Sequence, residues 1–209
     1  MRVKVCGITR REDAELAVDL GAAAIGLVFW PGSPRCIGSD RAKEIVDSLP
    51  AFVTPVGVFV DQPREFVEEI AAMVGLGAVQ LHGSETVAYC RGIRGPIIRA
   101  IALAETTDPM SVNAWPPDVT VLLDAHDPER HGGTGRTVDW TAAARVAAMR
   151  RAILSGGLRA DNVAAALDLV RPYAIDVSSG VESRPGVKDS GRMRAFFQAV
   201  ETARAQVRG

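Results

Sequence analysis

The sequence predicts a single (β/α)8 barrel over residues 1–209, an α/β fold in which eight parallel strands are each followed by a helix. Short apolar, β-branched runs alternate eight times with stretches of helical spacing, at about 20 to 35 residues per unit. The strand-like runs are nearly continuous in apolar residues, which is typical of parallel strands covered on both faces. Eight such units in 209 residues match the length of a compact barrel.

The elements follow one another in a regular order along the chain. We expect strands at 3–8 (VKVCGI), 23–29 (AAIGLVF), 54–60 (TPVGVFV), 78–83 (AVQLHG), 96–103 (PIIRAIAL), 120–126 (TVLLDAH), 152–158 (AILSGGL) and 173–181 (YAIDVSSGV). The helices expected after them lie at 11–21, 40–49, 63–74, 84–93, 106–115, 138–149, 159–170 and 190–207.

Local signals support individual helices. In the first helix apolar residues recur on one face, and Gly21 is suited to end it. Pro63 suits the first turn of the third helix, and Ser84 is the candidate cap of the fourth. The helix at 106–115 has the weakest pattern. A doubly wound open sheet is the competing fold, but the turn after the first strand reads CGIT and lacks the GxGxxG fingerprint.

Composition excludes several classes of protein. A net charge of −1 gives no electrostatic reason to expect nucleic acid or an acidic membrane as a partner. No apolar run reaches the roughly 18 residues of a membrane span, and no signal peptide is apparent at the N-terminus. The three scattered cysteines, Cys6, Cys36 and Cys90, argue against a disulfide framework. We therefore expect a cytoplasmic protein.

Polar side chains gather where the predicted strands end, which is the edge where (β/α)8 barrels build their active sites. A barrel built only for stability does not need cysteine, aspartate, histidine and arginine on one rim. The residues at these strand ends are Cys6, Arg35, Asp61, Gln80, His82, Arg99, Asp124, Ser155, Asp176 and Ser178. Cys6 itself has two interpretations, since a strand cysteine is usually an inert small hydrophobe, and one at a strand end beside Gly7 can be a reactive thiol.

Small residues follow the last two strands. LSGGL contains Gly156 and Gly157, and DVSSGVE contains Ser179 and Gly180. Barrels commonly bind phosphate with the loops after strands seven and eight, where uncovered backbone N–H groups face an anion. The alternative is that these glycines only permit tight turns. The glycine-rich segment 131–140 predicts a lid over the ligand, with Gly133 as a further candidate phosphate contact.

Two further rim residues carry charge. Asp124 follows a buried strand, so burial is expected to raise its pKa and allow it to act as a general acid. A carboxylate paired with Arg136 or Arg99 is the alternative interpretation. Arg35 lies in a loop stiffened by prolines, where a fixed guanidinium can hold a planar carboxylate, although the loop by itself favours a solvated arginine.

The histidines give no indication of a metal. His82, His126 and His131 lack ligand spacing and no CxxC pair is present, so we expect no metal. His82 and Gln80 end one strand, where they can hydrogen-bond either a substrate or a neighbouring loop. If Cys6 acts as a thiolate, something must depress its pKa, and no adjacent lysine or histidine obviously does so.

The ordered motifs VCGIT, GLVFWPGSPR, VGVFV, AVQLHG, LLDA, GGTGRTVDW, LSGGL and DVSSGVE resemble the phosphoribosylanthranilate isomerase family of tryptophan biosynthesis, over about residues 3–189. This resemblance implies an aldose–ketose isomerase that performs an Amadori rearrangement on a phosphoribosyl substrate without a cofactor. It also implies roles for particular residues, namely general base for Cys6, general acid for Asp124, carboxylate binding for Arg35, substrate contact for Asp176, and phosphate binding for Gly156, Gly157, Ser179 and Gly180. Gln80 and His82, at the end of the fourth strand, are further candidate substrate contacts.

Small departures from the family pattern occur at Ala125, His126 and Val138. They affect the expected shape of the lid rather than a proposed catalytic atom. Two alternatives stay open, another phosphosugar barrel of the histidine-pathway aldose–ketose isomerase type and a non-catalytic barrel that binds a phosphorylated metabolite. A cysteine at the end of the first strand argues against the former, which uses two aspartates. The sequence leaves monomer and homodimer open.

Overall fold

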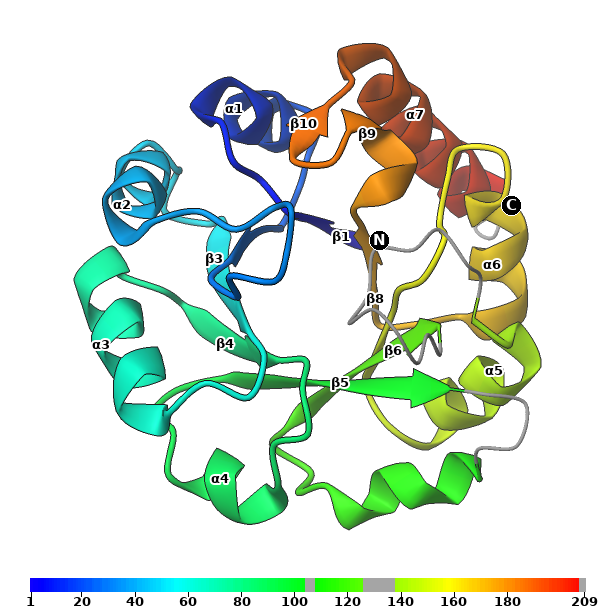
Figure 1. Cartoon of the computed structure of the whole chain (residues 1–209). Helices are drawn as coiled ribbons and strands as arrows, with labels where there is room; N and C mark the ends of the chain where they lie inside the picture. Colours follow the sequence, from blue (N-terminus) through cyan, green and yellow to red (C-terminus); the bar gives the residue numbers. More distant parts are fainter. Residues whose placement is uncertain (104–107, 126–137, 207–209) are drawn as a thin grey trace.

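The computed structural model is a closed barrel of eight parallel strands with helices arranged around it (Figure 1). Residues 1–103, 108–125 and 138–206 are described by the structure. The strands lie side by side in sequence order, and β1 closes the barrel by pairing with β8, with Val3 opposite Ile175. The predicted fold class is therefore confirmed.

Every predicted strand is present, and each is shorter than expected. The bounds are Arg2–Cys6 (β1), Ala24–Val28 (β2), Thr54–Phe59 (β3), Ala78–Leu81 (β4), Ile97–Leu103 (β5), Thr120–Ala125 (β6), Ala152–Leu154 (β7) and Ala174–Val177 (β8). The seventh was expected to reach residue 158. It ends earlier because Gly156 and Gly157 take φ values of 85° and 63°, which turn the chain out of the sheet.

Seven α-helices follow the strands within the described ranges. They are Arg11–Asp19 (α1), Ser39–Asp47 (α2), Arg64–Val74 (α3), Val87–Arg91 (α4), Trp140–Met149 (α5), Val163–Val170 (α6) and Ser190–Gln206 (α7). The weakly patterned segment between β5 and β6 forms a 3-10 helix at Pro109–Ala114 (η1). Asp108 caps it by accepting a hydrogen bond from the Met110 amide.

The N-cap of the fourth helix lies two residues later than predicted. Thr86 is the N-cap and accepts a hydrogen bond from the Tyr89 amide at 3.2 Å. Ser84 instead gives its amide and hydroxyl hydrogens to Asp61, at 2.6 and 2.8 Å. The Ser84 prediction was wrong because a carboxylate from the loop after β3 competes for this serine, and that contact is invisible in the local sequence.

A short hairpin after β8 was not predicted. The chain passes through a 3-10 turn at Ser179–Val181 (η2) into Glu182–Arg184 (β9) and Val187–Lys188 (β10), which pair antiparallel. Gly186, after Pro185, has a φ of 77° and makes the turn. This hairpin lies between α1 and α7 near the top of Figure 1.

The barrel has an apolar bottom and a polar top. Ala100, Leu122, Ile153 and Ala174 form an apolar cluster of their own, separate from the larger core between the strands and the helices. Side chains two residues apart on a strand share a face, so Asp124 continues the face of Leu122, and Asp176 that of Ala174. On this face of the strands the residues nearer the carboxyl ends are therefore polar, and those before them are apolar. No helix in the described ranges is long and apolar enough to cross a membrane.

Candidate active site

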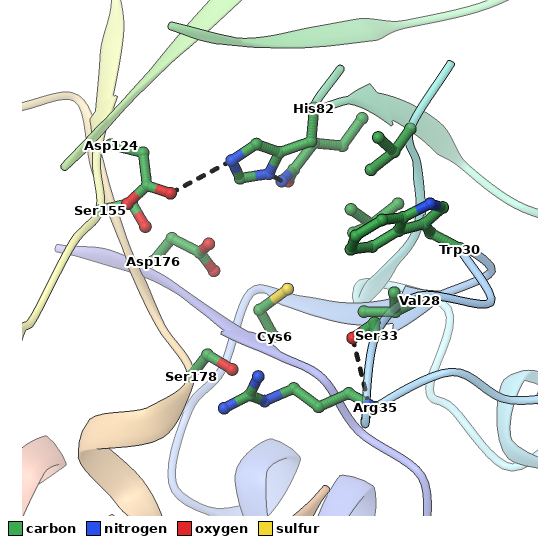
Figure 2. Close-up of a pocket in the computed structure, with 13 residues that line it drawn as sticks. Cys6, Val28, Trp30, Ser33, Arg35, His82, Asp124, Ser155, Asp176 and Ser178 are labelled. Carbon is green, nitrogen blue, oxygen red and sulfur yellow. Dashed lines mark hydrogen bonds and ion pairs between the residues drawn. The ribbon is translucent and has the colours of Figure 1, made fainter. Parts of the chain in front are cut away.

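A pocket opens at the carboxyl ends of the barrel strands (Figure 2). Side chains from β1, β2, β3, β4, β6 and β8 and from the following loops line it, and they include every predicted catalytic residue and every predicted substrate contact. The lining residues are Cys6, Val28, Trp30, Ser33, Arg35, Val58, Val60, Gln80, His82, Asp124, Ser155, Asp176 and Ser178. Trp30 and Ser33 were not singled out from the sequence, because a loop position alone does not indicate which way a side chain faces.

Cys6 is the last residue of β1 and is buried against Val28, Val58 and Trp30. Its neighbour on β2 is Gly26, where an added Cβ would lie only 2.8 Å from Cys6 Sγ. Glycine at this register position therefore leaves the space that the thiol occupies. Burial is the largest influence on this group, and it raises the pKa of the Cys6 thiol above its ordinary value.

Two lysines oppose the effect of burial on Cys6. Lys4 lowers the pKa of the thiol through its charge and a side-chain hydrogen bond, and Lys188 lowers it through its charge, whereas Asp176 raises it. Lys4 Nζ also donates to Asp176 Oδ1 at 3.0 Å, in a buried ion pair. Lys4 stands two residues before Cys6, so the two-residue period of a strand could have identified it from the sequence.

Asp124 belongs to a chain of three polar side chains. His82 Nε2 and Asp124 Oδ2 are 3.1 Å apart, and Gln80 Nε2 lies 3.2 Å from His82 Nδ1 (Figure 2). With the Gln80 amide donating to Nδ1, His82 carries its hydrogen on Nε2 and donates it to Asp124. The pairing of Asp124 with Arg99 that the sequence left open is not observed, and Arg136 lies outside the described residues.

Arg99 has a structural role instead. Its Nη1 donates to Glu85 Oε2 at 2.6 Å, and its Nη2 donates to the Gly83 carbonyl at 2.8 Å. The guanidinium also stacks over Trp115, 5.0 Å from the ring centroid. Asp61 is likewise occupied, by Ser84. These two rim residues hold loops together and do not line the pocket.

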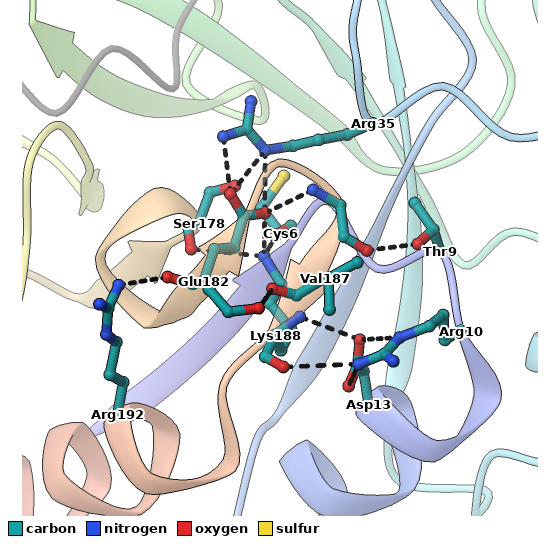
Figure 3. A network of polar contacts seen from close by, with 12 residues as sticks. Cys6, Thr9, Arg10, Asp13, Arg35, Ser178, Glu182, Val187, Lys188 and Arg192 are labelled. Atoms are coloured by element: carbon teal, nitrogen blue, oxygen red, sulfur yellow. Dashed lines mark hydrogen bonds and ion pairs between the residues drawn. The ribbon is translucent and has the colours of Figure 1, made fainter.

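Arg35 reaches the pocket from the loop after β2 and is nearly buried. Its Nε and Nη2 donate to the two carboxylate oxygens of Glu182, at 2.9 and 2.8 Å (Figure 3). The solvated arginine considered from the sequence is therefore wrong. Gly7, with a φ of 74°, lets the arginine pass, because a Cβ there would lie 2.4 Å from Arg35 Cδ. Glu182 was missed since it is 147 residues away.

Lys188 on β10 completes this network. Its Nζ donates to Glu182 Oε1 at 2.8 Å, to the Cys6 carbonyl at 2.6 Å and to the Ser178 carbonyl at 3.3 Å. Burial favours the neutral form of Glu182, but the hydrogen bonds from Arg35 and the charge of Lys188 outweigh it and lower the pKa of this carboxyl. The carboxylate is thus kept ionised between two cations.

The two glycine-containing loops lie against each other. An added Cβ at Gly180 would be 1.9 Å from the Leu158 carbonyl oxygen, so glycine is required for this approach. The amides of Gly156 and Gly157 donate no hydrogen bond to any residue that the structure describes. Ser155 and Ser178, which flank these loops, line the pocket, whereas Ser179 sits in η2. The fifth predicted phosphate contact, Gly133, lies outside the described residues.

The pocket is a polar site without a metal-binding arrangement in the part of the chain that is described. No three His, Cys, Asp or Glu side chains there are grouped so that they could hold a metal ion. The site instead combines a thiol, two carboxylates and an imidazole with a guanidinium at one side. Such a set can transfer protons and bind an anionic ligand.

Comparison with known proteins gives one consistent result. The family model for N-(5′-phosphoribosyl)anthranilate (PRA) isomerase matches residues 3–199. A protein of that name from Pelobacter propionicus is 44% identical over 211 residues, covering 99% of this chain and 98% of the relative. Phosphoribosylanthranilate isomerase from Thermus thermophilus superposes with a TM-score of 0.89 at 40% identity, covering 97% of this chain and 99% of that one.

A further solved structure carries a ligand. It is a phosphoribosylanthranilate isomerase in complex with reduced 1-(o-carboxyphenylamino)-1-deoxyribulose 5-phosphate, 40% identical to this chain with a TM-score of 0.86, covering 97% of this chain and 99% of that one.

Proposed function

The chain belongs to the N-(5′-phosphoribosyl)anthranilate isomerase family, the aldose–ketose isomerases of tryptophan biosynthesis, and we propose that it works with Cys6 as general base and Asp124 as general acid. The reaction converts N-(5-phosphoribosyl)anthranilate to 1-(2-carboxyphenylamino)-1-deoxyribulose 5-phosphate. The observation that carries the proposal is that the Cys6 thiol and the Asp124 carboxyl line the same pocket, from β1 and β6.

The first step opens the ribose ring. Asp124 gives a proton to the ring oxygen while the bond between that oxygen and C1′ breaks, and the anthranilate nitrogen forms a protonated Schiff base with C1′. The hydrogen bond between His82 and Asp124 supports this role, because it fixes the carboxyl in one orientation toward the pocket.

The second step moves the hydrogen on C2′. Cys6 as thiolate removes this proton, the electron pair forms the enolamine, and tautomerisation to the ketone follows. Burial works against the thiolate in the free enzyme, and Lys4 and Lys188 work for it. The positive charge of the Schiff base adds a further cation beside Cys6, which lowers the pKa of the thiol and favours the thiolate once the ring has opened.

The remaining pocket residues bind the two ends of the substrate. Arg35 faces the anthranilate carboxylate, and Gln80, His82 and Asp176 contact the opened sugar. The amides of Gly156 and Gly157, which donate to none of the described residues, support phosphate binding at the other end, together with the adjoining loop at Ser179 and Gly180. No step requires a cofactor.

Fluorescence of the anthranilate group tests the proposal, since substrate and product differ in emission. We expect Cys6→Ser and Asp124→Asn each to lower kcat by about 10²- to 10⁴-fold, the usual contribution of one proton-transfer group. Cys36→Ser is the matched control, because Cys36 is an exposed thiol that does not line the pocket. Near-normal turnover by Cys6→Ser would remove the thiol from the mechanism, and no turnover by the wild type would favour a silent binding barrel.

The assembly and location of the chain stay predictions. A relative from Thermotoga maritima is described as dimeric, which supports the homodimer over the monomer for this chain. Light scattering of the purified protein distinguishes a 22.2 kDa monomer from a dimer. The cytoplasm is the compartment that the sequence predicts.

A further inference from the structure

We propose that Glu182 is a positioning residue that holds one edge of the Arg35 guanidinium so that its other edge is presented to the carboxylate of the substrate. Lys188 is the counter-charge that allows Glu182 to stay buried and ionised. The inference rests on the proposed function, in which Arg35 binds the anthranilate carboxylate. It assigns the hairpin β9–β10, which carries both residues, to substrate recognition.

The donors of Arg35 divide into two edges. A guanidinium has five N–H groups, one on Nε and two on each Nη. Glu182 takes the edge formed by Nε and Nη2, at 2.9 and 2.8 Å. Nη1 makes no hydrogen bond to any residue described in the structure, and in Figure 3 it points away from Glu182. The edge formed by Nη1 and the second hydrogen of Nη2 can therefore bind a carboxylate in a fork.

The path of Arg35 is fixed at a second point. Its stem crosses Gly7, where a Cβ would lie 2.4 Å from Arg35 Cδ and 3.1 Å from Ser178 Oγ. With its stem confined by Gly7 and its inner edge held by Glu182, the arginine has little rotamer freedom left to lose when a ligand binds. Such preorganisation lowers the entropic cost of binding.

The charges of this group match an anionic ligand. Arg35, Glu182 and Lys188 together carry one net positive charge, and the side chains of Glu182 and Lys188 are 4% and 0% exposed. Lys4 and Asp176 nearby form a neutral pair. Without Glu182, two cations would face each other at the same place, and without Lys188 the pair of Arg35 and Glu182 would have no excess charge to attract a carboxylate.

Lys188 also connects the hairpin to the strand that bears the base. Its Nζ holds the backbone carbonyl of Cys6 at 2.6 Å and Glu182 at 2.8 Å. The carbonyl, not the thiol, is the contact, so the hairpin fixes where β1 ends. Glu182 acts on the substrate only through Arg35, and this distinguishes it from the groups that transfer protons.

Competitive inhibition by two small anions tests the proposal. Anthranilate alone probes the carboxylate end, and inorganic phosphate alone probes the phosphate end. For Glu182→Gln, which keeps the shape and removes the charge, we expect the Ki of anthranilate and the KM of the substrate to rise about tenfold, the equivalent of one weakened charge-assisted hydrogen bond. The Ki of phosphate should stay unchanged and kcat should change by less than about threefold.

A double-mutant cycle with Arg35→Ala decides whether Glu182 acts through the arginine. If it does, Glu182→Gln has no further effect on the Ki of anthranilate once Arg35 is gone. Multiplying effects in the double variant, or an equal rise in the Ki of phosphate, would overturn the proposal. If Arg35→Ala itself leaves anthranilate binding intact, the proposed role of Arg35 fails; if only Glu182→Gln has no effect, this inference alone fails.

A second variant covers the case in which Glu182→Gln does not fold. Removing one member of a buried pair leaves the other charge uncompensated, whereas removing both is better tolerated. We therefore expect Glu182→Gln/Lys188→Met to fold, as judged by circular dichroism and thermal unfolding, and to show the same weakened binding of anthranilate. Wild-type affinity for anthranilate in this folded variant would refute the positioning role.

Discussion

Replacing Gly180 by alanine should separate the two loops that we propose as the phosphate site. The new Cβ would lie 1.9 Å from the Leu158 carbonyl oxygen and 3.0 Å from its carbonyl carbon. Both atoms are backbone, so no side chain can rotate away. The conformation of Gly180 itself is open to other residues, because its φ is not among the positive ones. The effect of the substitution is therefore one of space alone.

The size of the effect follows from this contact. Ordinary van der Waals contact begins near 3.4 Å, so the loops at Leu158 and Gly180 must move apart by about 1.5 Å. A misplacement of about 1 Å at a binding site can cost roughly 10²-fold in rate. We expect Gly180→Ala to raise the Ki of inorganic phosphate and the KM of the substrate by about 10- to 100-fold, and to lower the free energy of unfolding by about 1–3 kcal/mol.

The assay combines inhibition kinetics with urea unfolding. Gly38→Ala is the matched control for phosphate binding, since nothing lies within 4 Å of a Cβ at that position. Gly38 is the N-cap of α2, where alanine is a poorer cap, so its free energy of unfolding should fall by about 1 kcal/mol while its Ki for phosphate stays unchanged. The Ki of anthranilate should be unaffected in both variants, because Arg35 lies on the loop after β2. A folded Gly180→Ala protein that binds phosphate as tightly as the wild type would refute the assignment of these loops.

Two further predictions concern the thiol and the core. Lys4→Met removes a positive charge that favours the thiolate, so we expect the pKa of Cys6 to rise further. The rate at which iodoacetamide alkylates Cys6 at pH 8 should then fall about tenfold for each unit by which the pKa rises. Lys43→Met is the exposed control, and a wild-type alkylation rate in Lys4→Met would contradict the role of Lys4. Leu154→Ala in fully buried β7 should lower the free energy of unfolding by about 2–5 kcal/mol in urea titrations, whereas Leu169→Ala, 53% exposed, should change it little.

The strand ends were predictable because the barrel imposes a simple rule on local sequence. Cys6 and Asp124 each follow an apolar run, and parallel strands bring their carboxyl ends to one edge. The same reasoning placed Gln80, His82 and Asp176 there, and the pocket contains all of these side chains. Each assignment needs only the direction of the chain and the two-residue period of a strand.

The contacts that polar side chains make with distant residues were harder to predict from the sequence. Lys4 could have been found on the face of Cys6, but its pairing with Asp176 joins residues 172 apart. Similarly, Ser84 was expected to cap a helix and instead binds Asp61 in another loop. In both cases the fold supplies a distant partner that no local pattern in the sequence indicates.

The sequence by itself determined the barrel, the rim and the predicted catalytic and substrate-contact residues that face the pocket, because alternation and period are properties of neighbouring residues. Only the tertiary structure decided that Arg35 is held by Glu182, that Lys188 stands between Glu182 and the Cys6 carbonyl, and that Gly180 touches Leu158. The contacts of Arg35 and Lys188 depend on the closure of β8 onto β1, which brings the two ends of the chain together, and the contact of Gly180 with Leu158 depends on the pairing of β7 with β8. These contacts depend on burial and on charges that are far apart in the sequence, so no local pattern predicts them.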